Sequence, residues 1–348
     1  MRKMRVLVLM HEKVVPPKSI ENLTPAQINP FKQEFDVIEA LESLGHEVIP
    51  LGVGDELLPI RQAVEDAKPH IAFNLLTHFH RVGIYASYVV SYLELLKVPY
   101  TGCNARGLLL ADDKVLAKKI LAWHRIPMPK FAVFRRERAI KEPVDIAAYG
   151  MEYPLFVKSG AEDSSYGIAQ ASIVSDARSL VERVRFVHQR IGTDALVEKY
   201  IEGRELYVSV LGNRRLQTFP IWELTFENLP AGTEPIATDK VKWDLAYQKK
   251  LGVMSGPAED IDEALRRRIH RVCKRVYRAL ELSGYARIDL RLAEDGEFFF
   301  LEANPNADLS HGDEFADGVA ASGIEYPELI QRMLSLGMRY SPAWKESS

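Results

Sequence analysis

The chain has 348 residues, enough for two or three domains with a substantial buried core. Lys plus Arg (45) nearly balance Asp plus Glu (48), so the net charge favours neither a nucleic-acid partner nor an anionic membrane. The two cysteines, Cys103 and Cys273, exclude a disulfide framework and a multi-cysteine zinc site. Because the chain has neither a bilayer-length apolar run nor a signal-peptide pattern, we expect a cytoplasmic protein without a membrane partner.

The first hundred residues alternate between predicted strands and helices. A polar, proline-bearing loop (10–33) follows the first strand. Such a βαβα order predicts a parallel α/β domain, which we place at residues 1–104. The predicted strands are 5–9, 47–51, 71–74 and a short one within 97–102, and the predicted helices are 35–44, 60–67 and 85–96.

The pattern changes after residue 114, where strands and helices alternate less regularly. Helices are predicted at 114–124, at 177–190 after the cap Asp176, and at 262–282. The last of these has a basic face, which could bind nucleic acid but is better explained as a solvated surface. We therefore predict an α+β region of two domains, 105–194 and 195–348.

The segment 287–304 predicts a β-hairpin with Asp295-Gly296 as its turn. If Glu294 pairs with Glu297, Asp289 lies opposite Glu302. The same register places Arg287 opposite Asn304 on the same face. Two facing carboxylates repel each other and require a cation, and Asn304 offers a third oxygen ligand of the kind that suits Mg²⁺. The alternative is an edge hairpin whose charges face water.

Two further segments have the residues of an anion-binding or nucleotide-binding site. Lys158 ends an apolar strand, a small-residue loop with Ser164 and Ser165 follows, and another strand is expected from Ile168. Such a loop and lysine suit a phosphate, although a surface hairpin explains them too. Glu198 ends a second buried strand and Glu205 begins the next one. These carboxylates could accept hydrogen bonds from a nucleoside, or they could be charged strand ends on a solvated rim.

Taken together, these segments resemble the ATP-grasp superfamily, specifically the D-alanine–D-alanine ligases and their relatives. The resemblance runs from about residue 99 to 330, in order and with similar spacing. It implies an ATP-grasp fold behind the N-terminal α/β domain, with ATP and two Mg²⁺ (or Mn²⁺) as cofactors. The implied metal ligands are Asp289, Glu302 and Asn304, and the implied catalytic residues are Arg287, Lys158 and Lys242.

The resemblance also assigns the nucleotide contacts. It places Lys114, Lys158 and Lys242 on the ATP phosphates, under a closing loop that contains Ser164 and Ser165. The base contacts come from Glu198, Lys199, Tyr200 and Ile201, and the ribose contact comes from Glu205.

The candidate substrate pocket departs from the family pattern. The family's Gly-rich segment after the first strand is replaced by Met10-His-Glu-Lys-Val-Val-Pro-Pro, and a second family motif is replaced around His78 and His80. By count, Asp313 stands where relatives have a serine that holds a substrate carboxylate. An aspartate there would repel a carboxylate and favour a cationic or hydroxyl-bearing acceptor. The candidate substrate residues are Ser310, His311 and Asp313.

The implied function is an ADP-forming carboxylate–amine ligase that joins small, amino-acid-like substrates through an acylphosphate. The alternatives are a true D-alanine–D-alanine ligase with a divergent pocket, and a non-catalytic ATP-binding sensor or assembly protein. The presence of Arg287 speaks against the last, because ATP binding alone needs no oxyanion donor. The sequence leaves the oligomeric state open, with a homodimer as one candidate because relatives are commonly dimers.

Overall fold

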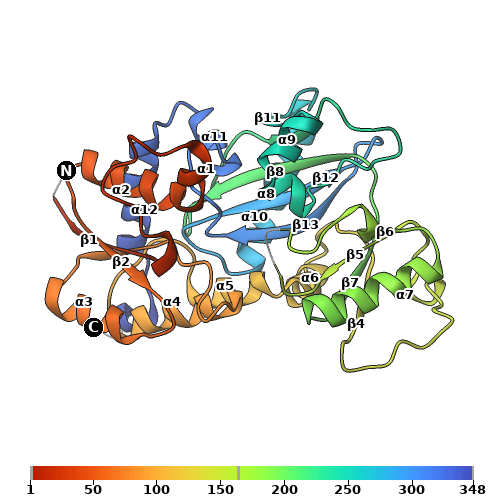
Figure 1. Ribbon diagram of the computed structural model, residues 1–348, viewed down its shortest axis with the longest axis horizontal. Helices are drawn as coiled ribbons and strands as arrows, with labels where there is room; N and C mark the ends of the chain where they lie inside the picture. Colours follow the sequence, from red (N-terminus) through yellow and green to blue (C-terminus); the bar gives the residue numbers. More distant parts are fainter. Residues whose placement is uncertain (1–2, 163–164, 347–348) are drawn as a thin grey trace.

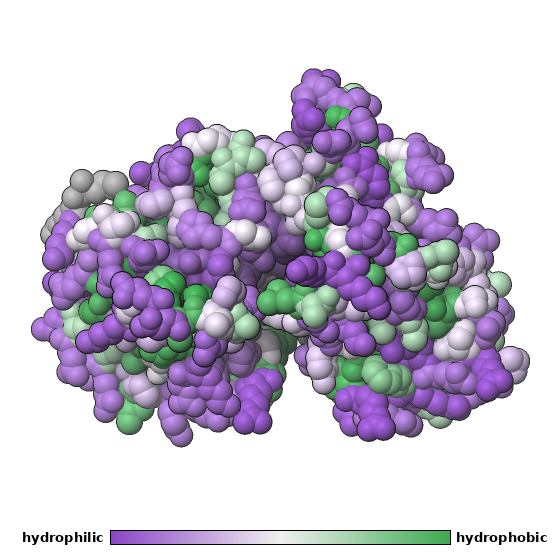
Figure 2. All heavy atoms as spheres, turned by 45° about the horizontal axis from the view of Figure 1, so that its top comes forward, coloured by the Kyte–Doolittle hydropathy of each residue, from purple (hydrophilic) through white to green (hydrophobic). Residues whose placement is uncertain are grey.

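The computed structural model describes residues 3–162 and 165–346, and it has three β-sheets. Figure 1 shows the N-terminal sheet at one end, the C-terminal sheet in the middle, and the small central sheet at the other end. In the space-filling view, a notch separates the central-sheet part from the rest, and apolar residues are scattered over a mostly hydrophilic face (Figure 2). Among the described residues, no helix is both long and apolar enough to cross a membrane.

The N-terminal sheet is parallel, as predicted, with β1 (Arg5–His11) between β2 (Glu47–Val53) and β3 (Ile71–Asn74). The β1 residues between its two ends are buried, because helices cover both faces of the sheet. The short strand expected within 97–102 does not form; Tyr100 makes only an isolated parallel bridge to Ala72. The helices of this part are α1 (Pro25–Ile28), α2 (Lys32–Ser43), α3 (Leu58–Ala67), α4 (Ala86–Leu95) and α5 (Ala105–Asp112), with 3₁₀ turns at Glu12–Val14, Asn29–Phe31 and Gly83–Tyr85.

The central sheet is antiparallel and has the order β4 (Phe131–Phe134), β7 (Ala195–Lys199), β5 (Leu155–Ser159) and β6 (Ile173–Val174). It packs its own core against α7 (Ala177–Phe186), which Asp176 caps as predicted and which a π-helical turn, Val187–Ile191, extends. The strand expected from Ile168 begins only at Ile173, after the 3₁₀ turn Gln170–Ser172. Another 3₁₀ turn covers Ala147–Tyr149, and α6 (Lys114–Trp123) precedes the sheet.

The pairing of β7 changes the expected domain boundary. We placed residue 195 at the start of the third domain, but Ala195–Lys199 hydrogen-bonds to β4 and β5 inside the central sheet. We therefore propose that the boundary lies between Lys199 and Arg204, where the chain leaves this sheet and enters the next.

The C-terminal sheet has the order β11 (Val253–Pro257), β10 (Trp222–Phe226), β8 (Arg204–Leu211), β12 (Tyr285–Leu292) and β13 (Phe298–Pro305), with β9 (Gln217–Thr218) beside β8. The predicted long helix is α10 (Glu263–Ala279), capped by Asp262. Side chains of this sheet and of the N-terminal domain share one core. The other helices are α8 (Asp239–Trp243), α9 (Leu245–Leu251), α11 (Glu314–Ala320), α12 (Tyr326–Arg339), which packs on α2 and β3, and α13 (Ala343–Glu346).

The β12–β13 hairpin reaches the predicted pairing by an unexpected route. The turn has three residues rather than two, because Ala293 instead of Glu294 faces Glu297. A register shift after Asp289 leaves Leu301 as an extra residue on β13. The longer turn and this bulge offset each other, so that Asp289 pairs with Glu302 and Arg287 with Asn304, as predicted.

Candidate functional site

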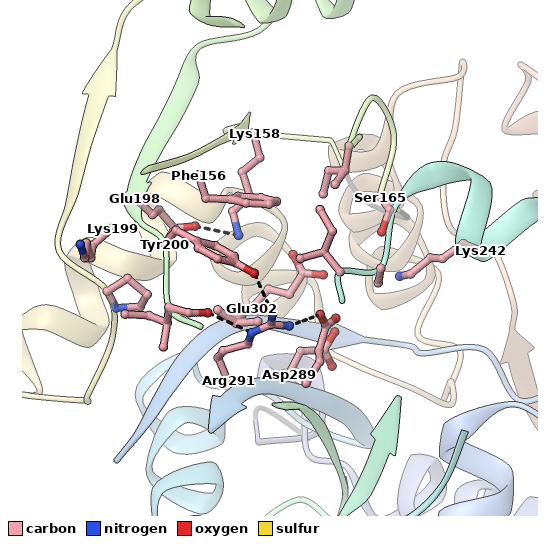
Figure 3. A pocket seen from close by; sticks show the side chains of 17 residues that line it. Phe156, Lys158, Ser165, Glu198, Lys199, Tyr200, Lys242, Asp289, Arg291 and Glu302 are labelled. Carbon is pink, nitrogen blue, oxygen red and sulfur yellow. Dashed lines mark hydrogen bonds and ion pairs between the residues drawn. The ribbon is translucent and has the colours of Figure 1, made fainter. Parts of the chain in front are cut away.

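A cavity of about 690 Å³, counted with its open mouth, lies between the central and C-terminal sheets (Figure 3). Both sheets contribute side chains, and the segment before α8 closes one side. Most residues predicted for nucleotide binding meet here, although they are far apart in sequence. Those lining the cavity are Pro129, Phe156, Lys158, Ser165, Ile168, Glu198, Lys199, Tyr200, Ile201, Glu205, Ile236, Ala237, Lys242, Asp289, Arg291, Leu301 and Glu302.

Of the two facing carboxylates of the hairpin, Asp289 is buried and Glu302 is half-buried, and both are held by cations from this chain. Arg287 binds Asp289 through two bonds, Nε to Oδ1 at 2.8 Å and Nη2 to Oδ2 at 3.0 Å. Lys114 Nζ lies 2.9 Å from Glu302 Oε2. Asn304 Nδ2 donates to Asp289 Oδ2 over 2.9 Å. These contacts join Lys114, Asn304 and Arg287, which do not line the cavity, to the carboxylates that do.

The pKa values of the two carboxylates are shifted in opposite directions. Burial, with a contribution from the opposed Glu302, raises the pKa of Asp289 to about 6 despite Arg287. Burial also disfavours the charged form of Glu302, but Lys114, Lys158 and Lys242 outweigh it and lower that pKa. No group of three or more His, Cys, Asp or Glu residues in the described chain is arranged to hold a metal. The hairpin does place two carboxylates and one side-chain amide together, and oxygen donors of this kind could hold Mg²⁺ completed by phosphate oxygens and water.

Glu198 has a different environment from the one expected. Its carboxylate bridges two buried lysines, with Oε1 2.5 Å from Lys118 Nζ and Oε2 2.9 Å from Lys158 Nζ. Both carboxylate oxygens are thereby occupied, which disfavours the predicted adenine contact through this side chain. Burial would raise the pKa of Glu198, but the two ammonium groups lower it. Sequence reasoning missed Lys118, since nothing local distinguishes it from a surface lysine of α6.

Arg291 is a second residue that sequence reasoning missed. Its guanidinium donates to Tyr200 Oη at 3.2 Å and to Glu205 Oε2 at 3.1 Å. It also donates to the carbonyls of Ile201 (3.1 Å) and Pro235 (3.0 Å). Arg291 thus joins the predicted base and ribose residues to β12, the strand that carries Asp289. A sequence signal existed, because Arg287, Asp289 and Arg291 alternate along one face of β12.

The remaining predicted nucleotide residues surround the cavity. Lys242 and Ser165 lie on the side opposite Glu198 and Lys199 (Figure 3). The Lys199 ammonium contacts Glu152 Oε1 at 3.3 Å on the outer side, so its side chain does not reach into the cavity. Ser164, also predicted for this site, lies outside the described residues.

The predicted substrate residues lie in the segment after β13 and do not line the cavity. Asp313 Oδ1 is 4.0 Å from Arg287 Nη1, and Glu314 Oε2 is 2.8 Å from the same nitrogen. Burial, followed by the charges of Glu314 and Asp308, raises the pKa of Asp313. Ser310 bonds to Asp308, and the His311 ring packs 4.0 Å from that of Tyr326. Sequence reasoning missed Glu314, which forms an ion pair with Arg287.

Comparisons with known proteins identify the family of this chain. The family model "D-ala D-ala ligase C-terminus" matches residues 120–335. A D-alanine–D-alanine ligase of Desulforudis audaxviator is 31% identical over 86% of this chain and 90% of its own length. An uncharacterized protein (y4sG) of Sinorhizobium fredii is also 31% identical, over 87% of this chain and 86% of its own length.

Solved structures show the same fold. The D-alanine–D-alanine ligase of Bacillus anthracis, determined in complex with ATP, matches with a TM-score of 0.74 at 21% identity and covers 100% of both chains. The predicted architecture, an ATP-grasp fold behind a parallel α/β domain, is thereby confirmed. The chain belongs to the D-alanine–D-alanine ligase family, ATP-dependent ligases that form C–N bonds.

Proposed function

We propose that this protein joins a small carboxylic acid to an amine, with ATP converted to ADP and phosphate. The observation that supports this most is the facing pair Asp289 and Glu302 with Arg287 beside it, at one end of a nucleotide-sized cavity. Asp289, Glu302 and Asn304 would hold Mg²⁺, which supplies positive charge to the phosphate oxygens. Lys114, Lys158 and Lys242 would neutralise the rest of the phosphate charge.

The chemistry follows from this arrangement. A carboxylate oxygen of the donor attacks the γ-phosphorus, and the bond to the ADP oxygen breaks to give an acylphosphate. The amine nitrogen then attacks the acyl carbon, and phosphate leaves as the amide forms and the nitrogen loses a proton. Arg287 would stabilise the oxyanion that develops on the acyl oxygen. Ser165 belongs to the segment that would cover the phosphates and exclude water.

We further propose that the amine acceptor is cationic or hydroxyl-bearing and has no carboxylate bound at this subsite. Asp313 and Glu314 place two acidic side chains against Arg287. A carboxylate brought to Asp313 would face an acid in place of a serine hydroxyl, next to the charge of Glu314. Ser310 and His311 remain proposed substrate contacts, although neither residue lines the cavity.

A true D-alanine–D-alanine ligase is the second candidate, favoured by what the curated relatives are called. One experiment separates these two candidate functions. Purified protein with Mg²⁺ and ATP is incubated with pooled carboxylic acids, each pool combined with D-amino acids, diamines or amino alcohols. Phosphate release and product mass are then measured.

We expect products with the diamines or amino alcohols and little with D-alanine as acceptor. In Asp313→Ser, which restores the residue found in relatives, D-amino acids should gain at least about tenfold in kcat/KM over the wild type. Efficient D-alanyl-D-alanine synthesis by the wild type would contradict the acceptor proposal. ATP binding without turnover in any pool would favour a nucleotide-binding sensor.

The oligomeric state and the location in the cell remain proposals. A homodimer would be tested by light scattering. A cytoplasmic location suits the use of ATP, and fractionation of the source cells would test it.

A further inference from the structure

The segment that connects β13 to α11, residues 306–313, is fastened to the N-terminal domain. We name it the acceptor loop, because it contains all three proposed substrate residues. Its partners lie on α2, about 275 residues earlier in the chain, and α2 packs beside α12 (Figure 1). The acceptor loop therefore has an anchor that is independent of the two sheets around the cavity.

Three side chains at the start of α2 make this anchor. Gln33 Oε1 accepts the backbone N–H of Leu309 at 3.0 Å, and Asp36 Oδ2 accepts that of His311 at 2.9 Å. Lys32 Nζ contacts Asp36 Oδ2 at 3.2 Å and also donates to the His311 carbonyl. Asp36 is 8% exposed, so its carboxylate is largely withdrawn from water. A buried carboxylate that accepts a backbone N–H makes a strong, directional bond.

The other end of the acceptor loop lies against the proposed catalytic arginine. Asp313 is 4.0 Å from Arg287, and Glu314, the next residue, is 2.8 Å from it. At its start, the Asn306 side chain accepts the backbone N–H of Cys103 at 2.8 Å. A shift of the middle of the loop would therefore move Asp313 and Glu314 relative to the group that stabilises the oxyanion.

We propose that Asp36, Gln33 and Lys32 are positioning residues that fix the acceptor loop and thereby set where the amine binds. This inference rests on the proposed function for its kinetic consequence, whereas its structural consequence can be measured without any substrate. None of the three residues needs to touch a substrate. They act through the backbone of Leu309 and His311.

The first experiment is hydrogen–deuterium exchange on the ligand-free protein. In Asp36→Ala, and separately in Gln33→Ala, peptides that cover 306–313 should exchange at least about tenfold faster, because a side-chain acceptor of their amides is gone. Asp36→Asn keeps an acceptor oxygen and should show a smaller change. The control is Glu65→Ala, which removes the acid of the exposed i,i+4 pair with Arg61 on α3 of the same domain. Unchanged exchange in the acceptor loop of both alanine variants would overturn the proposal.

The second experiment separates positioning from general damage. Acylphosphate formation is followed by trapping with hydroxylamine, a small nucleophile that needs no acceptor site and gives a hydroxamate and phosphate. In Asp36→Ala, kcat/KM for the amine found active in the pooled assay should fall about 10–100-fold, since small displacements at a reacting centre cost this much. The KM for ATP and the hydroxamate rate should stay within about twofold of the wild type.

An equal loss in amine use, hydroxamate formation and ATP affinity would overturn the proposal, because a merely structural defect affects all three. If no carboxylate–amine pair is turned over, the proposed function fails, and the exchange experiment still decides whether α2 fixes the loop.

Discussion

Replacing Glu198 with glutamine should destabilise the protein far more than the loss of one surface charge would. Glu198, Lys118 and Lys158 are 2%, 1% and 7% exposed, so the three charges compensate one another away from water. The Glu198→Gln side chain keeps the volume but leaves two buried ammonium groups next to each other. Burial lowers the pKa of Lys118 and Lys158 adds to the effect, whereas Glu198 is the main group that opposes it.

The magnitude follows from the contacts, at 2.5 and 2.9 Å. At an effective dielectric constant of about 20, each contact is worth about 6 kcal/mol before the cost of desolvation is subtracted. Removing one partner of a buried ion pair typically costs about 3–5 kcal/mol. We therefore expect the free energy of unfolding to fall by about 3–5 kcal/mol at pH 7. This loss of free energy of unfolding should shrink as the pH rises. A lysine with a lowered folded-state pKa loses its proton in the folded protein at a lower pH than in the unfolded chain, and a neutral lysine no longer repels its neighbour.

The assay is urea denaturation followed by circular dichroism, with a double-mutant cycle. Lys118→Met replaces the ammonium with an apolar side chain between two aromatic rings. The ring centroids of Phe131 and Phe300 are 5.9 and 5.5 Å from Lys118 Nζ. Combined with Glu198→Gln, it should recover at least about 1.5 kcal/mol of the loss. A Glu198→Gln protein within about 0.5 kcal/mol of the wild type would refute the reasoning.

Two further predictions concern the hairpin. Arg287→Ala should lower kcat about 10²–10³-fold with little change in the KM for ATP, because the guanidinium acts on charge that develops during reaction; turnover within tenfold of the wild type would contradict this role. Binding of Mn²⁺ without nucleotide, measured by electron paramagnetic resonance, should weaken about tenfold for each pH unit below about 6, the pKa of Asp289, because the protonated acid cannot ligate the ion. In Asp289→Asn this pH dependence should disappear, and a wild-type affinity that stays constant from pH 7 to pH 5 would argue against the metal site.

Local pattern was enough to predict most elements of the fold. The β1 run, the α10 stripe and the Asp176 cap each lie where the sequence placed them, because burial and capping depend on neighbouring residues. The pairing of Asp289 with Glu302 was also predicted, although the route was wrong. A three-residue turn would have shifted the partners by one position, and the extra residue at Leu301 restored them.

Contacts between distant segments could not be predicted in the same way. The sequence shows that Glu198 ends a strand, but not that α6 and β5 bring a lysine to each of its oxygens. It likewise cannot show that β7 joins the central sheet, or that α2 holds the acceptor loop.

The sequence by itself determined which side chains alternate on each strand face, where the helices begin, and which motifs carry the charges that nucleotide chemistry needs. Only the tertiary structure decided which of those charges meet, and so which carboxylate lies opposite another one in the hairpin and which one neutralises two lysines. The physical reason is that side-chain periodicity is set by backbone geometry within a few residues. The partners of a buried charge are set by how whole sheets and helices pack.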